Sequence, residues 1–164
     1  MTIRFGILTL SDRSSRGERA DASGPALADL IHAQNWSVAE QLILPDDESA
    51  IRSALTEWAD SGRFDIILTT GGTGFAARDV TPEATRAVIQ RDAPGLAEIM
   101  RSESMKKTPH AMLSRAIAGI RGRTLIINLP GSPKGAIENL QTILPVLSHA
   151  VQLLKDDPAS ESSH

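Results

Sequence analysis

The sequence contains no cysteine, so neither a disulfide bond nor a thiolate-bound metal can be part of this chain. Aromatic residues make up only 3% of it, and it has no tract of basic residues. Because nucleic-acid binding usually needs a basic face with stacking aromatics, we expect no nucleic-acid partner. No apolar run approaches the roughly 20 residues that a membrane-spanning helix requires. Met1 leads into a polar, strand-like segment rather than a signal peptide, which favours a cytoplasmic protein with no membrane partner.

Side chains suited to nucleophilic catalysis are also scarce. The histidines are His32, His110, His149 and His164, and their spacing is not that of a metal site. Ser114 has no base or orienting residue nearby in the sequence, so a hydrolase triad is unsupported. The remaining candidates are backbone amides, carboxylates and basic side chains.

The composition is that of one ordinary folded domain. The 164 residues are 41% hydrophobic, and 17 basic against 20 acidic residues give a net charge of −3. A chain of this size can bury a proper core, and neither a linker nor an internal repeat interrupts it. We therefore expect a single domain over residues 1–155. The polar tail 156–164 is expected to be disordered.

Apolar runs alternate with segments of helical periodicity along the chain. Strands are expected at 3–10, 36–44, 64–70 and 124–129, with a shorter one at 117–120. Helices are expected from 24, from about 49 to 60, from 81 to about 90, from 94 to about 104–107, and from 133. A short turn is expected at 111–115, and Pro145 predicts a kink or a break in the last helix. This order indicates an α/β fold with a parallel sheet and helices on both faces.

The most informative segment follows the expected strand 64–70. Thr69-Thr70 leads into Gly71-Gly72-Thr73-Gly74, so the backbone is almost bare at the point where the strand ends. Glycines allow positive φ and close approach of a ligand, and a loop of this kind presents several N–H groups to an anion. A phosphate site at the mouth of the sheet is one interpretation. The other is a tight turn from strand to helix with no ligand, with Thr81 as the N-cap of the next helix and Pro82 as its first residue.

Two aspartates favour the phosphate interpretation. Asp79 follows the glycine loop, and Asp46 follows the strand 36–44. Since loops at the carboxyl ends of parallel strands share one edge of a sheet, we expect these loops and the loop 11–17 to meet there. A carboxylate beside a phosphate needs a cation between them, and Mg²⁺ is commonly held by one or two carboxylates and phosphate oxygens. Alternatively, Asp46 with its acidic neighbours caps a helix, and Asp79 forms an Asx turn. Arg78 is either a solvated surface arginine or a phosphate clamp.

These motifs resemble those of a known family. The segment from Gly71 to Thr85 is similar to the molybdopterin adenylyltransferases, which include bacterial Mog-type proteins and the G domains of gephyrin-like proteins. Ser11-Asp12, Leu44-Pro45-Asp46 and the segment from Asn128 to Pro133 also match, as do Pro94-Gly95 and 118–122. The similarity covers about residues 3–155. In relatives called MoaB a different segment often follows the glycine loop, whereas 78–82 here follows the Mog pattern.

The resemblance implies a three-layer α/β sandwich with a mostly parallel central sheet, and it assigns roles to particular residues. Asp46 and Asp79 match the two essential carboxylates, which are catalytic and would hold the metal. The nucleotide-binding positions are Gly71, Gly72, Thr73, Gly74, Pro130 and Gly131. The molybdopterin-binding positions are Ser11, Asp12, Arg78, Ser104 and Arg115, and Lys134 is a weaker match as an anion contact.

The reaction that the resemblance implies is adenylylation of molybdopterin by ATP with Mg²⁺ as the cofactor. A homotrimer and a molybdate-insertion enzyme are the implied protein partners. The residues suit this chemistry, because joining two phosphates needs positioning and charge neutralisation rather than a catalytic histidine or cysteine. The alternative is a catalytically silent molybdopterin-binding or scaffold module of the same fold.

Overall fold

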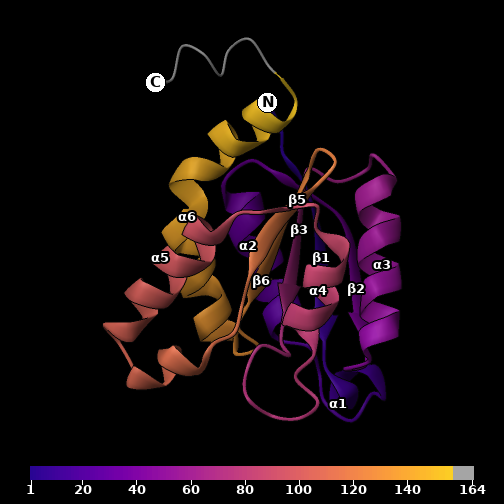
Figure 1. The fold of residues 1–164 in the computed structure, drawn as a ribbon, viewed down its shortest axis with the longest axis vertical. Helices are drawn as coiled ribbons and strands as arrows, with labels where there is room; N and C mark the ends of the chain where they lie inside the picture. The colour runs from indigo at the N-terminus through magenta and orange to yellow at the C-terminus, as the bar shows by residue number, and fades with distance from the viewer. Residues whose placement is uncertain (157–164) are drawn as a thin grey trace.

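The computed structural model describes residues 1–156 of the chain. Of the tail expected to be disordered, 157–164 lie outside the described residues. A sheet of six strands forms the middle layer, in the order β2-β1-β3-β6-β5-β4 (Figure 1). The strands are β1 (Arg4–Leu10), β2 (Ser37–Leu44), β3 (Ile66–Thr70), β4 (Arg91–Asp92), β5 (Ala118–Arg121) and β6 (Thr124–Leu129).

The sheet is mostly parallel, as the alternation of strands and helices predicted. β2, β1, β3 and β6 run parallel, whereas β5 is antiparallel to β6 and to β4. The sequence did not predict β4, because the two residues of this strand are both exposed and carry no apolar pattern. Parallel pairing places the carboxyl ends of the four main strands at one edge of the sheet.

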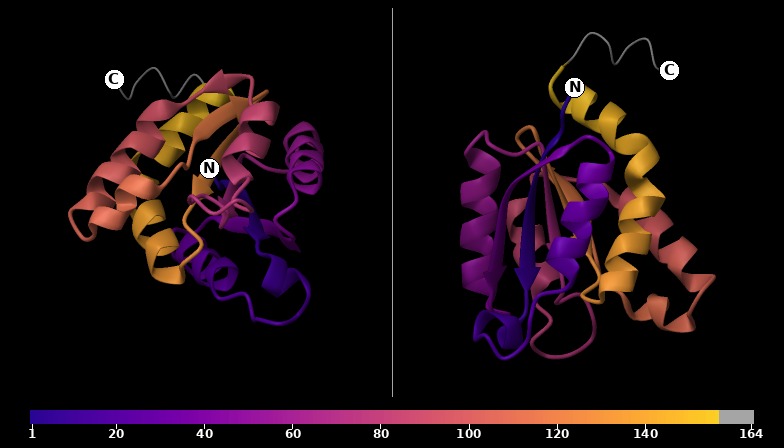
Figure 2. Two further views of the ribbon diagram at one scale, coloured as in Figure 1. Left: turned by 60° about the horizontal axis from the view of Figure 1, so that its bottom comes forward. Right: turned by 180° about the vertical axis from the view of Figure 1, so that it is seen from behind.

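Helices cover both faces of the sheet. The helical elements are α1 (Asp12–Ser15), α2 (Ser23–Ala33), α3 (Glu48–Asp60), α4 (Thr81–Val88), α5 (Pro94–Met105), the 3₁₀ helix η1 (Pro109–Leu113) and α6 (Pro133–Leu154). α2, α5 and α6 lie on one face, and α3 and α4 lie on the other (Figures 1 and 2). The three-layer α/β sandwich is therefore confirmed.

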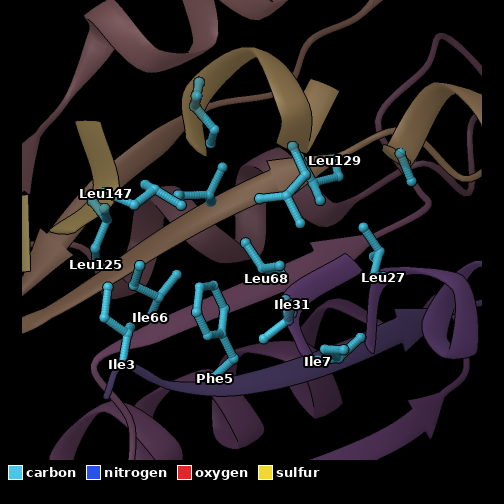
Figure 3. Packing of buried hydrophobic residues seen from close by; sticks show 14 of the residues in the cluster. Ile3, Phe5, Ile7, Leu27, Ile31, Ile66, Leu68, Leu125, Leu129 and Leu147 are labelled. Carbon is cyan, nitrogen blue, oxygen red and sulfur yellow. The ribbon is translucent and has the colours of Figure 1, made fainter. Parts of the chain in front are cut away.

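The core divides into two clusters, one on each side of the sheet. Along β1, Phe5 and Ile7 point to the cluster beneath α2 and α6 (Figure 3). Leu8 and Leu10 belong to the cluster beneath α3, on the other face of the sheet. This separation follows from the two-residue period of a strand. Every residue of β3 and β6 is buried, since helices cover both sides of these central strands.

The structure corrects the predicted ends of α4 and confirms the predicted start of α6. The N-cap of α4 is Val80 rather than Thr81, because the Thr81 hydroxyl donates to the Gly71 carbonyl at 2.9 Å and is not used as a cap. α4 ends at Val88, since the amide of Gln90 donates to Ile120 as the chain enters β4. α6 begins at Pro133, as predicted, and Ser132 is its N-cap. α6 continues through Pro145 without a break, and its ribbon changes direction along its length (Figure 2).

Candidate functional site

A polar cavity of about 190 Å³ lies at the carboxyl edge of the parallel strands. Ser11 after β1, Asp46 after β2, Gly71 after β3 and Gly131 after β6 all line it. The meeting of the loops from three strands, predicted from their positions alone, is thus confirmed, and the loop after β6 joins them. Part of the expected loop 11–17 is the one-turn helix α1, whose N-cap Ser11 accepts from the amide of Ser14 at 3.2 Å.

The glycine loop is held in a shape that side chains would obstruct. Gly71 has φ 106° and Gly72 has φ 67°, and a Cβ atom on Gly71 would collide with the carbonyl oxygen of Leu10. The loop is tied to α4, because Thr81 donates its hydroxyl to Gly71 and its amide to the carbonyl of Gly72. Within residues 1–156, the amides of Gly72, Thr73 and Gly74 donate to no protein acceptor. These N–H groups can therefore serve an anion.

Asp46 carries a carboxylate oxygen that is buried without a partner. Its Oδ2 accepts from the amide of Asp12 at 3.1 Å, and its own amide donates to Asp12 Oδ1 at 2.9 Å. Its Oδ1 has no hydrogen-bond partner among residues 1–156. Burial raises the pKa of Asp46 above its usual value, the Asp12 amide opposes this, and the charges of Asp12 and Asp79 add to it. A cation at Oδ1 would relieve this unfavourable environment.

Asp79 faces the same cavity from the glycine loop. Its Oδ2 accepts from the amide of Ala76 at 3.0 Å, and its amide donates to the carbonyl of Ala76 at 2.9 Å. The Asx turn that the structural interpretation predicted is not formed, because it needs the amide of Thr81, two residues on, and that amide donates to the carbonyl of Gly72 instead. The Asp79 side chain closes the preceding turn, 76–79. Among residues 1–156, no hydrogen-bond donor contacts the other carboxylate oxygen, Oδ1. Stabilising the turn thus leaves Asp79 with an oxygen for a ligand.

The carboxylate oxygens at this edge of the sheet suit Mg²⁺ better than a metal ion whose ligands all come from protein side chains. No group of three or more histidine, aspartate or glutamate side chains in the described part of the chain could hold a metal ion. Mg²⁺ needs fewer protein ligands, because it keeps several waters and takes phosphate oxygens. Asp46 with its unpartnered Oδ1 and Asp79 on the same cavity supply the one or two carboxylates that such a site requires.

The other predicted site residues do not all reach this cavity. Arg78 lines it, and its Nη1 lies 3.9 Å from Asp12 Oδ2 in an exposed ion pair. Ser104 instead lines a second cavity of about 300 Å³, together with Thr73, Gly74 and Pro130. The glycine loop therefore contributes to both cavities, with Gly71 and Gly72 lining the first and Thr73 and Gly74 lining the second. Lys134 is exposed near the start of α6.

The guanidinium of Arg115 contacts the protein itself. It donates to the carbonyl oxygens of Gly74 at 2.8 Å and Asp79 at 2.7 Å, and it forms an ion pair with Glu83 at 2.8 Å. Asp47, weighed as a helix cap, is the N-cap of α3 and accepts from the amide of Ala50 at 2.8 Å. The capping alternative thus holds for Asp47, whereas Asp46 points elsewhere.

The structure also adds residues that the sequence did not single out. Asp21 lines the first cavity and accepts from the Thr9 hydroxyl at 2.8 Å and the Gly24 amide at 3.1 Å. Asn139 lines the second cavity and donates to Ser104 Oγ at 3.0 Å. The sequence could have indicated Asn139, because it is a polar residue on the buried face of α6, next to Ala136 and Leu140. Asp21 lies two residues before α2. An aspartate in this position predicts the start of a helix and does not indicate a binding site.

The fold and the site together define an α/β protein with a glycine-lined cavity at the carboxyl ends of its parallel strands. Residues 6–149 match the family model described as a probable molybdopterin binding domain. The chain belongs to this family, as the motifs of its sequence indicated.

Named relatives cover nearly the whole chain. It is 43% identical over 155 residues to the molybdopterin adenylyltransferase of Helicobacter pylori strain J99, covering 93% of this chain and 88% of that protein. It is 46% identical over 158 residues to the molybdenum cofactor synthesis protein cinnamon of Drosophila melanogaster, covering 95% of this chain. The chain spans 26% of the length of cinnamon and 23% of the length of Dictyostelium discoideum gephyrin.

Solved structures share the fold. The molybdopterin biosynthesis enzyme MoaB of Thermus thermophilus has a TM-score of 0.90 and 52% identity, with 96% of this chain and 99% of that chain covered. A MogA structure has a TM-score of 0.86 and 38% identity, with 92% and 99% covered. No helix in residues 1–156 combines the length and apolar character needed to cross a bilayer.

Proposed function

We propose that this chain is a molybdopterin adenylyltransferase, which uses Mg²⁺ and ATP to form adenylyl-molybdopterin and release pyrophosphate. One observation carries the proposal: Asp46, with an unpartnered buried oxygen, and Asp79 face one cavity beside the free amides of the glycine loop. The named adenylyltransferases of H. pylori and Escherichia coli, 43% and 42% identical, support the choice of reaction.

The reaction joins two phosphates. The terminal phosphate of molybdopterin attacks the α-phosphorus of ATP, a new P–O bond forms, the bond from the α-phosphorus to the bridging oxygen breaks, and pyrophosphate leaves. Since a phosphate is already ionised near neutral pH, this nucleophile needs no strong base. The obstacle is repulsion between two polyanions, so catalysis consists mostly of positioning and charge neutralisation.

Particular residues would meet these needs. The amides of Gly72, Thr73 and Gly74 would donate to phosphate oxygens, with Pro130 and Gly131 forming the adjacent wall. Asp46 and Asp79 would hold Mg²⁺, which when bound neutralises phosphate charge. Ser104 in the second cavity would bind the pterin, and Arg78 and Ser11 at the first cavity would contact anionic groups of molybdopterin. Asp12 would act through its two hydrogen bonds with Asp46.

Substitution of the aspartates tests the proposal. Asp46→Asn and Asp79→Asn are each expected to lower the rate of pyrophosphate release from ATP and molybdopterin by about 100-fold or more, because each loses a carboxylate facing the phosphates. Asp47→Asn is the matched control, since asparagine also caps a helix and Asp47 lies outside the cavity. Circular dichroism would establish that all three variants fold. Full turnover by both site variants would refute the assignment of the carboxylates.

A catalytically silent scaffold is the second candidate. The description of the matching family as a probable molybdopterin binding domain favours it, because that description names binding and no reaction. Asp79 in the Mog-like segment 78–82 and the unpartnered oxygen of Asp46 favour the enzyme. Binding of molybdopterin without pyrophosphate release from the wild-type chain would decide for the scaffold.

The proposal extends to assembly and setting. We expect a homotrimer, as the family resemblance implies, and a sedimentation experiment at micromolar concentration that gives a monomer would count against it. The product would pass to a molybdate-insertion enzyme, and the need for ATP favours the cytoplasm as the place of the reaction.

A further inference from the structure

Arg115 connects the walls of both cavities. Its backbone amide donates to the carbonyl of Thr73 at 2.8 Å, and its Nε donates to the carbonyl of Gly74 at 2.8 Å. Its Nη2 donates to the carbonyl of Asp79 at 2.7 Å. Thr73 and Gly74 line the second cavity, and Asp79 lines the first. One residue therefore contacts both ends of the loop 73–79, whose residues line both cavities.

The loop between these contacts has little else to hold it. Phe75, Ala76, Ala77 and Arg78 are all exposed, so packing does not fix their conformation. Inside the loop, Ala76 and Asp79 form two hydrogen bonds with each other. Beyond it, Arg78 reaches Asp12 only at 3.9 Å with its side chain 62% exposed. An exposed ion pair of this kind contributes little.

Arg115 is itself firmly held. From α5, Arg101 donates through Nε to the carbonyl of Ser114 at 3.0 Å and through Nη2 to the carbonyl of Ala116 at 2.9 Å. These carbonyls flank Arg115 in the chain. Glu83 on α4 fixes the remaining nitrogen, Nη1, at 2.8 and 2.9 Å. The guanidinium is thus anchored to α4 and, through its backbone, to α5.

We infer that Arg115 is a positioning residue that holds the loop 73–79 so that Asp79 faces the first cavity while Gly74 shapes the second. The inference rests on the proposed function for the chemistry that Asp79 serves. It replaces the role of molybdopterin contact that the family resemblance implied for Arg115. A guanidinium suits this role better than an ammonium, because its planar fork presents donors on three nitrogens to two carbonyls and a carboxylate, whereas the donors of an ammonium share one nitrogen.

The test compares Arg115→Ala and Arg115→Lys with Arg121→Ala in the full chain. Arg121 is a matched control, because it also joins a carbonyl, that of Val88, and a carboxylate, that of Asp60. It lies at the opposite edge of the sheet, where it pairs with Thr124 at the start of β6. Hydrogen exchange of residues 73–81 is measured without substrates, together with kcat, both KM values and the melting temperature.

The expected results separate positioning from binding. Arg115→Ala should speed exchange in 73–81 by about tenfold or more, because the loop loses charge-assisted hydrogen bonds. It should lower kcat by a similar factor and change the molybdopterin KM less than about threefold, since Asp79 is misplaced but no substrate contact is lost. Arg115→Lys should recover part of kcat. Arg121→Ala should leave loop exchange and kcat unchanged even if its melting temperature falls.

The opposite pattern would overturn the inference. Unchanged loop exchange in both Arg115 variants, or a tenfold rise in the molybdopterin KM with kcat retained, would make Arg115 a substrate contact instead. If Arg115→Ala does not fold, Arg115→Lys decides by the same criteria. If the wild-type chain shows no turnover, the proposed function fails, and the exchange comparison still decides whether Arg115 holds the loop.

Discussion

At the scale of single residues, Gly71 shows how backbone shape limits the choice of side chain. Its φ of 106° lies where side chains are disfavoured, and its Cα faces the carbonyl oxygen of Leu10. Gly62 also has positive φ, at 74°, but nothing lies within 4 Å of the place where its Cβ would be. Comparing the two glycines therefore distinguishes two contributions to the free energy that an alanine would cost. One is the unfavourable positive φ, and the other is the collision of its methyl group with the backbone.

We predict that Gly71→Ala costs about 3 kcal/mol of unfolding free energy, whereas Gly62→Ala costs about 1 kcal/mol. Both variants lose the freedom of positive φ, and only the first drives a methyl group into backbone. Urea unfolding of the two variants and the wild type measures the difference. If both variants lost the same free energy of unfolding, the end of β1 at Leu10 would be able to move aside without an energetic cost.

At the scale of elements, the turn from β2 to α3 gives two adjacent aspartates different tasks. Asp47 has the extended backbone of an N-cap and bonds the Ala50 amide, so it stabilises α3. Asp46 turns instead toward α1 and the cavity, where its Oδ1 stays unpartnered within residues 1–156. A helix cap and the carboxylate proposed to hold the metal thus lie side by side in one turn.

Asp47→Ala should lower the free energy of unfolding by about 1 kcal/mol, the usual cost of a lost N-cap. Pyrophosphate release should stay at the wild-type rate, because the cavity keeps Asp46. Asp46→Asn should give the reverse, with activity lost and stability kept or raised, since it removes the charge of a half-buried carboxylate whose Oδ1 has no hydrogen-bond partner among residues 1–156. Chemical unfolding and turnover of both variants check this, and a strongly destabilised Asp46→Asn would point to a structural role.

At the scale of the whole molecule, Asp65 joins elements from both ends of the chain. Its buried carboxylate, 2% exposed, pairs with Arg4 of β1 at 2.9 Å and with Lys155 beyond α6 at 3.0 Å. Burial raises the pKa of Asp65, but the hydrogen bonds from Arg4 and Lys155 outweigh burial and bring the pKa below its usual value. At the end of the sheet opposite the candidate site, one carboxylate therefore links β1 to the residue that follows α6.

The pH dependence of stability follows from that lowered pKa. A carboxyl that is more acidic in the folded state stabilises the fold fully above its unfolded pKa of about 3.9 and loses this contribution as the pH falls through the folded value. Asp65→Asn should therefore cost about 2 kcal/mol near pH 7, as expected for hydrogen bonds to a charged group. The difference from wild type should shrink below pH 4. A gap that stays constant in urea unfolding down to about pH 2 would contradict this.

The sequence by itself determined the layers of the fold and the meeting of the loops that line the candidate site. Apolar runs long enough for buried strands and helical periodicity between them are local patterns, and parallel order follows from their alternation. The rule that loops after parallel strands share one edge then brought Asp46, Asp79 and the glycine loop together. The segment 71–85 was specific enough to indicate the family.

Only the tertiary structure decided which groups pair. The contact between Arg115 and Gly74 joins residues 41 positions apart, and no local pattern distinguishes it from a contact with a ligand. The same holds for the unpartnered oxygen of Asp46, the antiparallel edge formed by β4, and the division of the predicted site residues between two cavities. Periodicity fixes which face of an element is buried, whereas the partners of a polar side chain depend on how the packed elements meet.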